Sequence, residues 1–320
     1  MLNRRNFMAQ VGILASGSVL ASSFNALEPA LAQNTNTEAR APDFRIAHLT
    51  DMHVMPDGAM SVNAQAGFIK ALEHSQNLSR KPDLILQGGD AIMDALRTGK
   101  SDVKAQWEAF QQALAKHLRT PIRHAIGNHD CWTGAGSKND PLYGKAWALQ
   151  EYKLKTPYYS FDAGNWHFIV LDSTNLTTPD THGYTAKLDE TQFKWLENDL
   201  KNRPANRPVL VVSHIPILAV APYMDGDNET TGNWVVPGAW MHIDARRLKT
   251  LFASHPNVRL CLSGHIHLQD SAVYNGVTYA CNGAVCGNWW RGNYQETKPG
   301  YAVVDLYNDG AFNLEYVQYK

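Results

Sequence analysis

Five short apolar segments of this chain each run directly into a polar motif containing Asp, Asn or His. The apolar segments have the length and composition of buried strands, and open α/β sheets place their ligands at the carboxyl ends of the strands. The sequence therefore predicts that the five motifs meet at one edge of a sheet. In chain order they are Asp51-Met52-His53, Gly89-Asp90, Gly127-Asn128-His129-Asp130, Ser213-His214 and Gly264-His265-Ile266-His267.

The remaining pattern alternates strands with helices and later turns to hairpins. Strands are expected at 44–50, 83–87, 121–126, 208–213 and 258–263, with helices at 63–79, 103–118, 188–202 and 243–254. Turn residues at 163–165, 275–276 and 308–310 indicate three hairpins, because Asn, Asp and Gly tolerate the conformations that tight turns need. This order predicts an α/β fold with mixed sheets, parallel early and antiparallel late.

Composition limits the possible partners. The chain of 320 residues has 29 basic and 30 acidic residues, so it lacks the positive field that a general nucleic-acid binder or a polybasic membrane protein needs. No nucleic-acid partner is expected, whereas an enzyme acting on one small phosphate ester remains compatible. Four cysteines cannot form a dense disulfide framework. Cys261 and Cys281 lie on neighbouring expected strands, and buried free thiols are favoured over a disulfide between them.

The N-terminus is typical of an export signal. Arg4 and Arg5 form a twin-arginine pattern, a modestly apolar run covers 11–20, and Ala30-Leu31-Ala32 matches a cleavage site. We expect a Tat signal peptide over 1–32, a flexible leader over 33–42 and one folded domain over 43–320. The alternative is an uncleaved anchor or an ordinary helix, but the apolar run is too short to span a bilayer. The Tat export machinery is then a partner, the periplasm is the expected location, and no stable membrane span is predicted.

The polar motifs share a coordination chemistry. Each motif alone usually marks a turn, a cap or a polar loop, whereas all five in order, each after a strand, favour a common site. Carboxylates, imidazoles and one carboxamide suit Mn, Fe or Zn rather than Ca or a thiolate site. Two cations about 3.5–4 Å apart can clamp a phosphoryl group and provide a bound hydroxide that attacks phosphorus. A carboxylate can bridge them because it has two oxygens.

The motif set resembles the calcineurin-like metallophosphoesterase superfamily, from about residue 44 to the last strands. The resemblance implies a four-layer sandwich of two mixed β-sheets flanked by helices, and a pair of divalent or mixed-valence metal ions (Mn, Fe or Zn). It implies that His129 lies beside the substrate phosphate as a catalytic residue without binding metal. The implied ligands of one metal are Asp51, His53, Asp90 and His267, and those of the other are the bridging Asp90, Asn128, His214 and His265.

The function expected from this resemblance is binuclear phosphoester hydrolysis, with a small phosphodiester favoured. The motifs look most like those of the bacterial cyclic-nucleotide and glycerophosphodiester phosphodiesterases. A phosphomonoesterase is the alternative enzyme, and an inactive interaction protein of the same fold is the alternative from another class. The complete set of metal ligands argues against the inactive interaction protein. Met93 occupies the position at which purple acid phosphatases carry a tyrosine ligand, so a purple iron centre is not expected.

The remaining polar and aromatic residues have less specific interpretations. Asp94 is predicted to be a surface or capping residue, and Asp130 to orient His129 or cap a helix. Two long loops, 215–240 and 282–299, follow metal-bearing strands or their hairpin and are expected to determine specificity. Their aromatic residues could stack a nucleobase or simply pin the loops. The histidines expected to be structural are His48, His124, His167 and His242.

Overall fold

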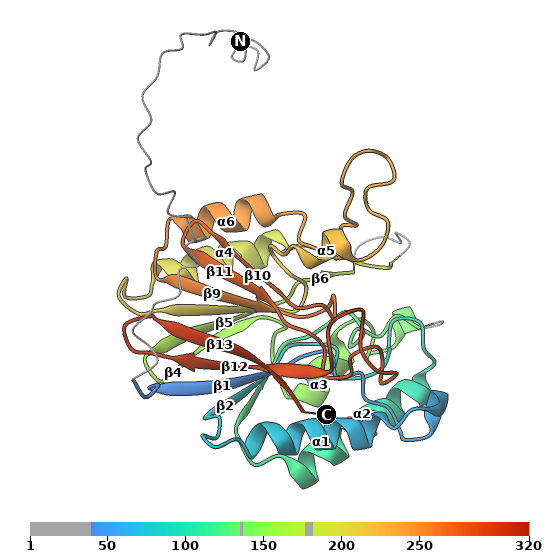
Figure 1. The fold of residues 1–320 in the computed structure, drawn as a ribbon. Coiled ribbons are helices and arrows are strands. Elements are labelled where there is room, and N and C mark those ends of the chain that lie inside the picture. Colours follow the sequence, from blue (N-terminus) through green and yellow to red (C-terminus); the bar gives the residue numbers. More distant parts are fainter. Residues whose placement is uncertain (1–39, 135–136, 177–181, 320) are drawn as a thin grey trace, which may run out of the picture. The chain divides into compact units, whose positions relative to one another are not determined.

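Two β-sheets stack face to face, and helices cover the outer face of each (Figure 1). The computed structural model describes residues 40–134, 137–176 and 182–319. This arrangement confirms the predicted four-layer sandwich of two mixed sheets flanked by helices. The expected signal peptide over 1–32 and most of the expected leader over 33–42 lie outside the described residues.

The first sheet has the order β13-β12-β1-β2-β3. Strands β1 to β3 run parallel, and β12 and β13 add an antiparallel edge. Helices α1 (Ala64–Gln76), α2 (Lys100–His117) and α3 (Ala146–Tyr152) supply apolar side chains to its outer face. The strands are β1 (Phe44–Leu49), β2 (Leu84–Gln87), β3 (Ile122–His124), β12 (Gly300–Leu306) and β13 (Phe312–Gln318).

The second sheet has the order β10-β11-β9-β8-β5-β4. Its inner pairs are parallel, and β4 and β10 close the two edges antiparallel. Helices α4 (Glu190–Lys201) and α6 (Ala245–Ala253) pack on its outer face. The strands are β4 (Tyr159–Ala163), β5 (Trp166–Leu171), β8 (Val209–Ser213), β9 (Val258–Ser263), β10 (Asp270–Tyr274) and β11 (Val277–Cys281).

The two sheets share an apolar core. Alternate residues of each strand point between the sheets, as the two-residue period of a strand requires. Ile46, Leu210 and Leu262 are fully buried there. Burying one such side chain stabilises the fold by roughly 1.5–3 kcal/mol, so this core fixes the sheets against each other and determines where the strand ends point.

Most expected elements form within a few residues of their predicted limits, and the elements that the sequence pattern missed are short. Helix α3 covers only 7 residues, which is too few for a clear helical period. All four cysteines are buried and free. The other short elements are α5 (Ala221–Met224), the two-stranded sheet of β6 (Thr174–Asn175) and β7 (Thr185–Ala186), and 3-10 turns η2 (Ala59–Ser61) and η3 (Ser137–Asn139).

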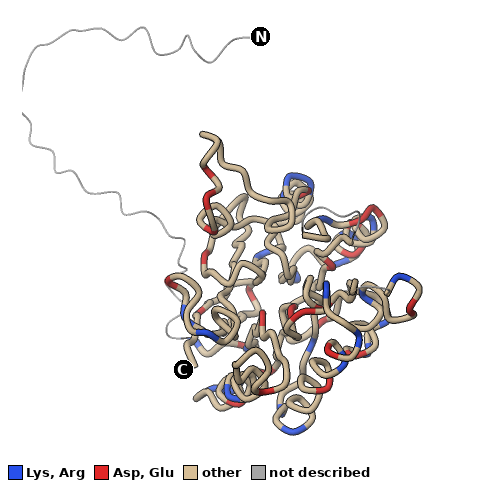
Figure 2. The backbone as a smooth tube through the Cα atoms, turned by 90° about the vertical axis from the view of Figure 1, so that its right-hand side faces the viewer, with Lys and Arg blue, Asp and Glu red and all other residues tan. Residues whose placement is uncertain are grey.

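Charged side chains are mixed over the described chain. Segments of Lys and Arg and segments of Asp and Glu are scattered among each other over the backbone (Figure 2). Among the described helices, none is long and apolar enough to cross a membrane.

Candidate metal centre

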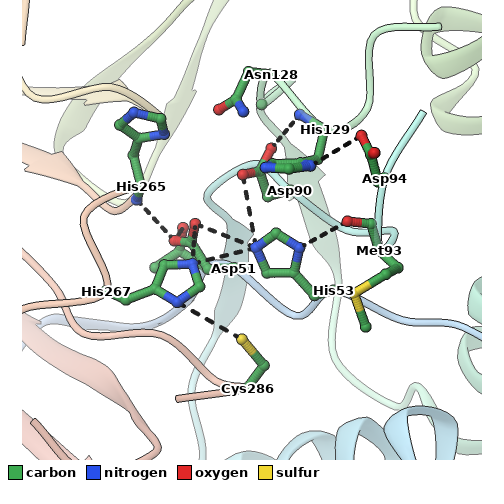
Figure 3. Close-up of polar contacts among 12 residues, drawn as sticks. Asp51, His53, Asp90, Met93, Asp94, Asn128, His129, His265, His267 and Cys286 are labelled. Carbon is green, nitrogen blue, oxygen red and sulfur yellow. Dashed lines mark hydrogen bonds and ion pairs between the residues drawn. The ribbon is translucent and has the colours of Figure 1, made fainter. Parts of the chain in front are cut away.

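The five polar motifs converge at the carboxyl ends of β1, β2, β3, β8 and β9, so both sheets contribute to one site. Figure 3 shows residues of four of these motifs. All seven predicted metal ligands lie together there, and six of them are at most 2% exposed. His265 and the predicted catalytic His129 are half-buried. Three of the strands belong to one sheet and two to the other, which explains why the motifs are far apart in the sequence.

One group of ligand atoms surrounds His53. Its Nε2 atom lies 3.2 Å from His267 Nε2 and 3.8 Å from Asp90 Oδ2. His267 Nε2 is in turn 3.4 Å from Asp51 Oδ1. Asp51 Oδ1 is buried without a hydrogen-bond partner, while its Oδ2 accepts bonds from Thr50 and the His265 backbone. The unpartnered oxygen therefore faces the imidazoles as a free acceptor.

A second group surrounds His214. Its Nε2 atom lies 3.1 Å from Asp90 Oδ2 and 3.1 Å from Asn128 Oδ1. Ligand atoms of Asp90, His214 and His265 all lie within 4.8 Å of one another. Asp90 belongs to both groups, and it is the only carboxylate of the predicted set that does so among the described residues.

The imidazoles are turned so that one nitrogen of each is free to face the cluster. His53 Nδ1 lies 3.1 Å from the Met93 carbonyl, and His214 Nδ1 lies 2.9 Å from the Gly88 carbonyl. His267 uses Nδ1 on Gly287, whereas His265 uses Nε2 on Ala239. A carbonyl that accepts from one ring nitrogen fixes the tautomer and leaves the lone pair of the other nitrogen available to a metal.

The backbone at the strand ends is strained. Positive φ angles are sparsely populated by residues with a side chain, and such strain persists where the surrounding structure enforces it for function. Glycines allow the loops to approach closely: a Cβ at Gly127 would lie 2.1 Å from Asp90 Oδ1, and one at Gly264 would lie 2.2 Å from Asp51 Oδ2. Five predicted ligands have φ between 42° and 71°, namely Asp51, His53, Asp90, His265 and His267.

The electrostatics of the cluster call for added positive charge. Burial alone would favour the neutral carboxyl of Asp90, but the neighbouring His214 and His129 outweigh it and hold its pKa well below the usual range. Conversely, burial lowers the pKa of His214, yet Asp90 and Asp51 raise it to about 9. Burial and neighbouring imidazoles lower the pKa of His53 to about 3. A cation can replace the proton that the carboxylates hold on His214.

These observations fit a metal pair. The orphaned Asp51 oxygen, the inward-facing imidazole nitrogens and the carboxylate charge that raises the pKa of His214 are what metal ions would satisfy. The donors are oxygen and nitrogen, which suit divalent first-row metals.

His129 lies at the pocket side of the cluster. Its backbone N–H donates to Asp90 Oδ1 at 2.7 Å, and its Nδ1 lies 3.2 Å from Asp94 Oδ1. Burial opposes protonation of this imidazole, but the carboxylates of Asp90 and Asp94 raise its pKa. Asp94 was predicted to be a surface or capping residue. It does accept a hydrogen bond from the backbone N–H of Leu96, but it also orients a site residue, so the surface interpretation is wrong.

Asp130 has a different role from the one predicted. Its carboxylate accepts bonds from the backbone N–H groups of Gly127, Asp90 and Ala91, and from the Tyr152 hydroxyl. In the described part of the chain its carboxylate forms no hydrogen bond or ion pair with the His129 ring. Burial, and then the charge of Asp90, raise the pKa of Asp130 to about 7. This carboxyl fastens the loops after β2 and β3 to each other.

A neighbour that sequence reasoning missed is Cys286. Its thiol lies 3.9 Å from His267 Nδ1, and its Sγ groups with His53 and His267 atoms within 4.8 Å. The only feature of the sequence that could have indicated this position is that Cys286 lies in the loop after β11, directly before a glycine.

The two long loops form the outer wall of the site. Aromatic and acidic side chains enclose a cavity of about 200 Å³ over the cluster. Trp289, at φ 45°, has its ring centroid 4.6 Å from that of His267, with the two rings tilted by 35°. Trp290 donates to the His53 carbonyl and thus pins its loop, while Arg291 is exposed and bonds the Met60 carbonyl. The wall residues that the sequence did not single out are Tyr184, Asp225 and Tyr294.

Comparison with known proteins agrees with this geometry. Residues 44–269 match the family model of the calcineurin-like phosphoesterases. A 3',5'-cyclic-nucleotide phosphodiesterase of Nostoc is 25% identical over 86% of this chain and 93% of that protein. A probable glycerophosphodiester phosphodiesterase of Arcobacter nitrofigilis is 23% identical over 72% of this chain and 75% of the relative.

The fold comparison points the same way. A dimetal phosphatase from Danio rerio superposes with a TM-score of 0.60 at 15% identity, covering 86% of this chain and 96% of that one. At this identity the likeness concerns the fold alone. With the family match over most of its length, the chain belongs to the calcineurin-like phosphoesterase family. It is accordingly a metal-dependent phosphoric ester hydrolase, and the predicted enzyme class is confirmed.

Proposed function

We propose that this chain is a phosphodiesterase that acts on small phosphodiesters with the help of two metal ions. The position of Asp90 carries the proposal. Its Oδ2 atom lies 3.1 Å from His214 Nε2 and 3.8 Å from His53 Nε2, so one carboxylate faces both groups of ligands. A shared carboxylate is the arrangement that two neighbouring cations need.

The roles of the individual ligands follow from the two groups. When bound, the two cations supply positive charge for the phosphoryl oxygens and lower the pKa of bound water. Mn, Fe and Zn all suit these donors. One cation would be held by Asp51, His53, Asp90 and His267, and the other by Asp90, Asn128, His214 and His265.

His129 acts on the substrate. Asp94 holds its Nδ1 atom, and the carboxylates of Asp90 and Asp94 raise the pKa of the imidazole and so favour its protonated form. The other nitrogen then donates to a phosphate oxygen, or gives its proton to the leaving alkoxide. Because Asp94 fixes the ring, the proton is positioned before substrate arrives.

A diester suits the pocket better than a monoester. A phosphomonoester carries about −1.5 to −2 charges at pH 7, whereas a diester carries one. The cavity lining in the described part of the chain holds Asp90 and Asp225 but neither Lys nor Arg. The relatives that are named phosphodiesterases favour the same choice.

Two chromogenic substrates test this proposal. Protein loaded with Mn, Fe or Zn is assayed with bis-p-nitrophenyl phosphate and p-nitrophenyl phosphate. We expect a higher kcat/KM for the diester. A preference for the monoester would make the chain a phosphomonoesterase, and metal-loaded protein that cleaves neither ester would contradict the proposed function.

We also propose that the Tat pathway exports the chain to the periplasm, with cleavage after Ala32. The support is the sequence around Arg4 and Arg5 together with the site at Ala30-Leu31-Ala32. Replacing both arginines with lysine should retain the protein in the cytoplasm, with Arg40 and Arg45 replaced in a control. Exported wild-type protein should begin at Gln33 by mass spectrometry, and an intact Met1 would contradict cleavage.

A further inference from the structure

An uncompensated carboxylate lies in the wall of the pocket, away from the metal cluster. Asp225 lines the same cavity as Asp90 and His129. Its Oδ1 atom accepts hydrogen bonds from the Tyr294 hydroxyl at 2.8 Å and from the Gln295 amide at 3.1 Å. Both donors are neutral, and within the described part of the chain neither Lys nor Arg forms an ion pair with Asp225. Its negative charge is therefore left for a ligand to balance.

The loop that carries Asp225 adds to this negative charge. Residues 215–243 contain Asp225, Asp227 and Glu229 and no Lys or Arg, and the corresponding protruding loop shows only acidic colouring in Figure 2. The opposite end of the pocket is the metal cluster, which is positive once cations are bound. The pocket is therefore polarised from a positive metal end to a negative loop end.

Aromatic rings connect the two ends. The Trp289 ring lies 4.6 Å from the His267 ring, and Tyr294 lies at 88° to Trp289 with centroids 5.8 Å apart. The Tyr294 ring is 5.7 Å from the His267 ring while its hydroxyl bonds Asp225, so one tyrosine separates the carboxylate from the metal cluster. Faces of Trp and Tyr attract ammonium groups, and the attraction grows when water is excluded.

We propose that the preferred substrates are zwitterionic phosphodiesters whose alcohol carries an ammonium group. This inference rests on the proposed phosphodiesterase function. The phosphate lies at the metal end, and the ammonium lies between Asp225 and the aromatic rings of Trp289 and Tyr294. A zwitterion matches both ends of the pocket, whereas a neutral nucleobase leaves the Asp225 charge unbalanced. The cavity of about 200 Å³ suits a small amino alcohol.

A purely structural role of Asp225 makes a different prediction. The carboxylate joins the two wall loops through Tyr294 and Gln295. Asn at this position still accepts both hydrogen bonds through its side-chain oxygen but carries no charge. Asp225→Asn therefore separates charge recognition from loop joining.

The experiment compares two diesters that differ by one charge. p-Nitrophenyl phosphocholine and 3,3-dimethylbutyl p-nitrophenyl phosphate share the leaving group and the shape of the alcohol, and only the first has a cationic nitrogen. Wild-type protein should favour the choline ester in kcat/KM by at least about 10-fold. In Asp225→Asn this ratio should fall to within about 2-fold of unity, whereas the control Asp227→Asn should keep it.

Three results would overturn the inference. The first is a wild-type ratio near unity, and the second is an unchanged ratio in Asp225→Asn. The third is a preference for the p-nitrophenyl ester of thymidine 5'-phosphate over the choline ester, if this preference is lost in Asp225→Asn. Asp225 would then recognise a nucleoside and not an ammonium group.

A binding measurement separates this inference from the proposed function. Calorimetry of the metal-loaded protein compares choline with 3,3-dimethyl-1-butanol. We expect tighter binding of choline in wild type and in Asp227→Asn, and loss of the difference in Asp225→Asn. If no diester is hydrolysed, the proposed function fails, and the calorimetric difference alone decides whether the cation site exists.

Discussion

The middles of the strands are apolar and well packed, whereas the carboxyl ends of the same strands carry buried polar groups on strained backbone. On β1, Ile46 is fully buried between the sheets, and five residues later Asp51 has a φ of 55° and a buried oxygen without a partner. On β8, apolar Leu210 is followed after four residues by the charged cluster around His214. The middles supply packing energy, and the ends use it to hold strained, closely spaced polar groups. Function is concentrated where the packing rules are broken.

The largest effect is expected at the strand end that both ligand groups share. Asp90→Ala should abolish diester hydrolysis and release both metals, because the two cations lose their common anion. Metal content by mass spectrometry and turnover of bis-p-nitrophenyl phosphate provide the measurement. Asp102→Ala, at an exposed carboxylate of α2, is the control and should retain both metals. Full metal occupancy in Asp90→Ala would refute the shared-ligand role.

The next effect separates catalysis from metal binding at a strand end. His129→Ala should keep both metals and lower kcat by about 10²–10⁴-fold, because the ring donates a proton or hydrogen bond without being a ligand. If His129 protonates the leaving group, the loss should be smaller for p-nitrophenolate esters than for alkyl esters. Loss of a metal ion, or turnover at the wild-type rate, would show that this residue has another role.

A change in the middle of a strand should do the reverse. Leu210→Ala removes a fully buried side chain from the core between the sheets and should lower the free energy of unfolding by about 2–5 kcal/mol. Metal content and kcat should stay near wild-type values. Leu314→Ala, at a half-buried position against the same core, is the control with a smaller expected loss. Loss of metal from folded Leu210→Ala would remove the distinction between middles and ends.

The contact between Asp94 and His129 gives a smaller effect. Asp94→Asn should lower kcat by about 10–100-fold without loss of metal, since the carboxylate acts by holding the His129 ring. The double variant Asp94→Asn, His129→Ala should be no slower than His129→Ala alone, because residues that act as a unit are not additive. Independent, multiplying losses would contradict the positioning role.

The smallest effect is a pH dependence from a buried histidine on β1. Burial lowers the pKa of His48 to about 4, against the opposing charge of Asp51. The unfolded chain takes up this proton below pH about 6.5, so the stability contribution is complete above that pH and is lost as pH falls toward 4. When the pH falls from 7 to 5, the free energy of unfolding should decrease by about 2 kcal/mol less in His48→Gln than in wild type.

Urea denaturation at the two pH values measures this difference. His255→Gln, at a partly exposed histidine beyond α6, is the control and should follow wild type. An equal loss in wild type and His48→Gln would assign the pH dependence to other groups.

The sequence predicted the strand ends better than the loops for a physical reason. The apolar run of each strand ends at a glycine or a polar residue. Asp51, Asp90 and His214 are therefore easy to recognise directly after such runs. The wall depends on how 215–240 and 282–299 fold back, which no local pattern encodes. Asp225 and Tyr294 meet across 69 residues, and the contact between Asp94 and His129 spans 35.

Backbone strain was equally hidden. Asp and His adopt a positive φ more often than most residues, but residue type alone does not indicate which Asp or His does so. At Asp51 the conformation accompanies the close approach of Gly264, which only the folded structure reveals. That the candidate ligands lie together could therefore be predicted, but their backbone geometry could not.

Metal titration of the metal-free protein tests the central claim most directly. Activity toward bis-p-nitrophenyl phosphate is followed as Mn is added in known equivalents per chain, with bound metal measured in parallel. A site built around a shared Asp90 predicts binding of two equivalents, with activity rising mainly as the second is bound. Full activity at one equivalent, or two bound equivalents without hydrolysis, would contradict a binuclear phosphodiesterase.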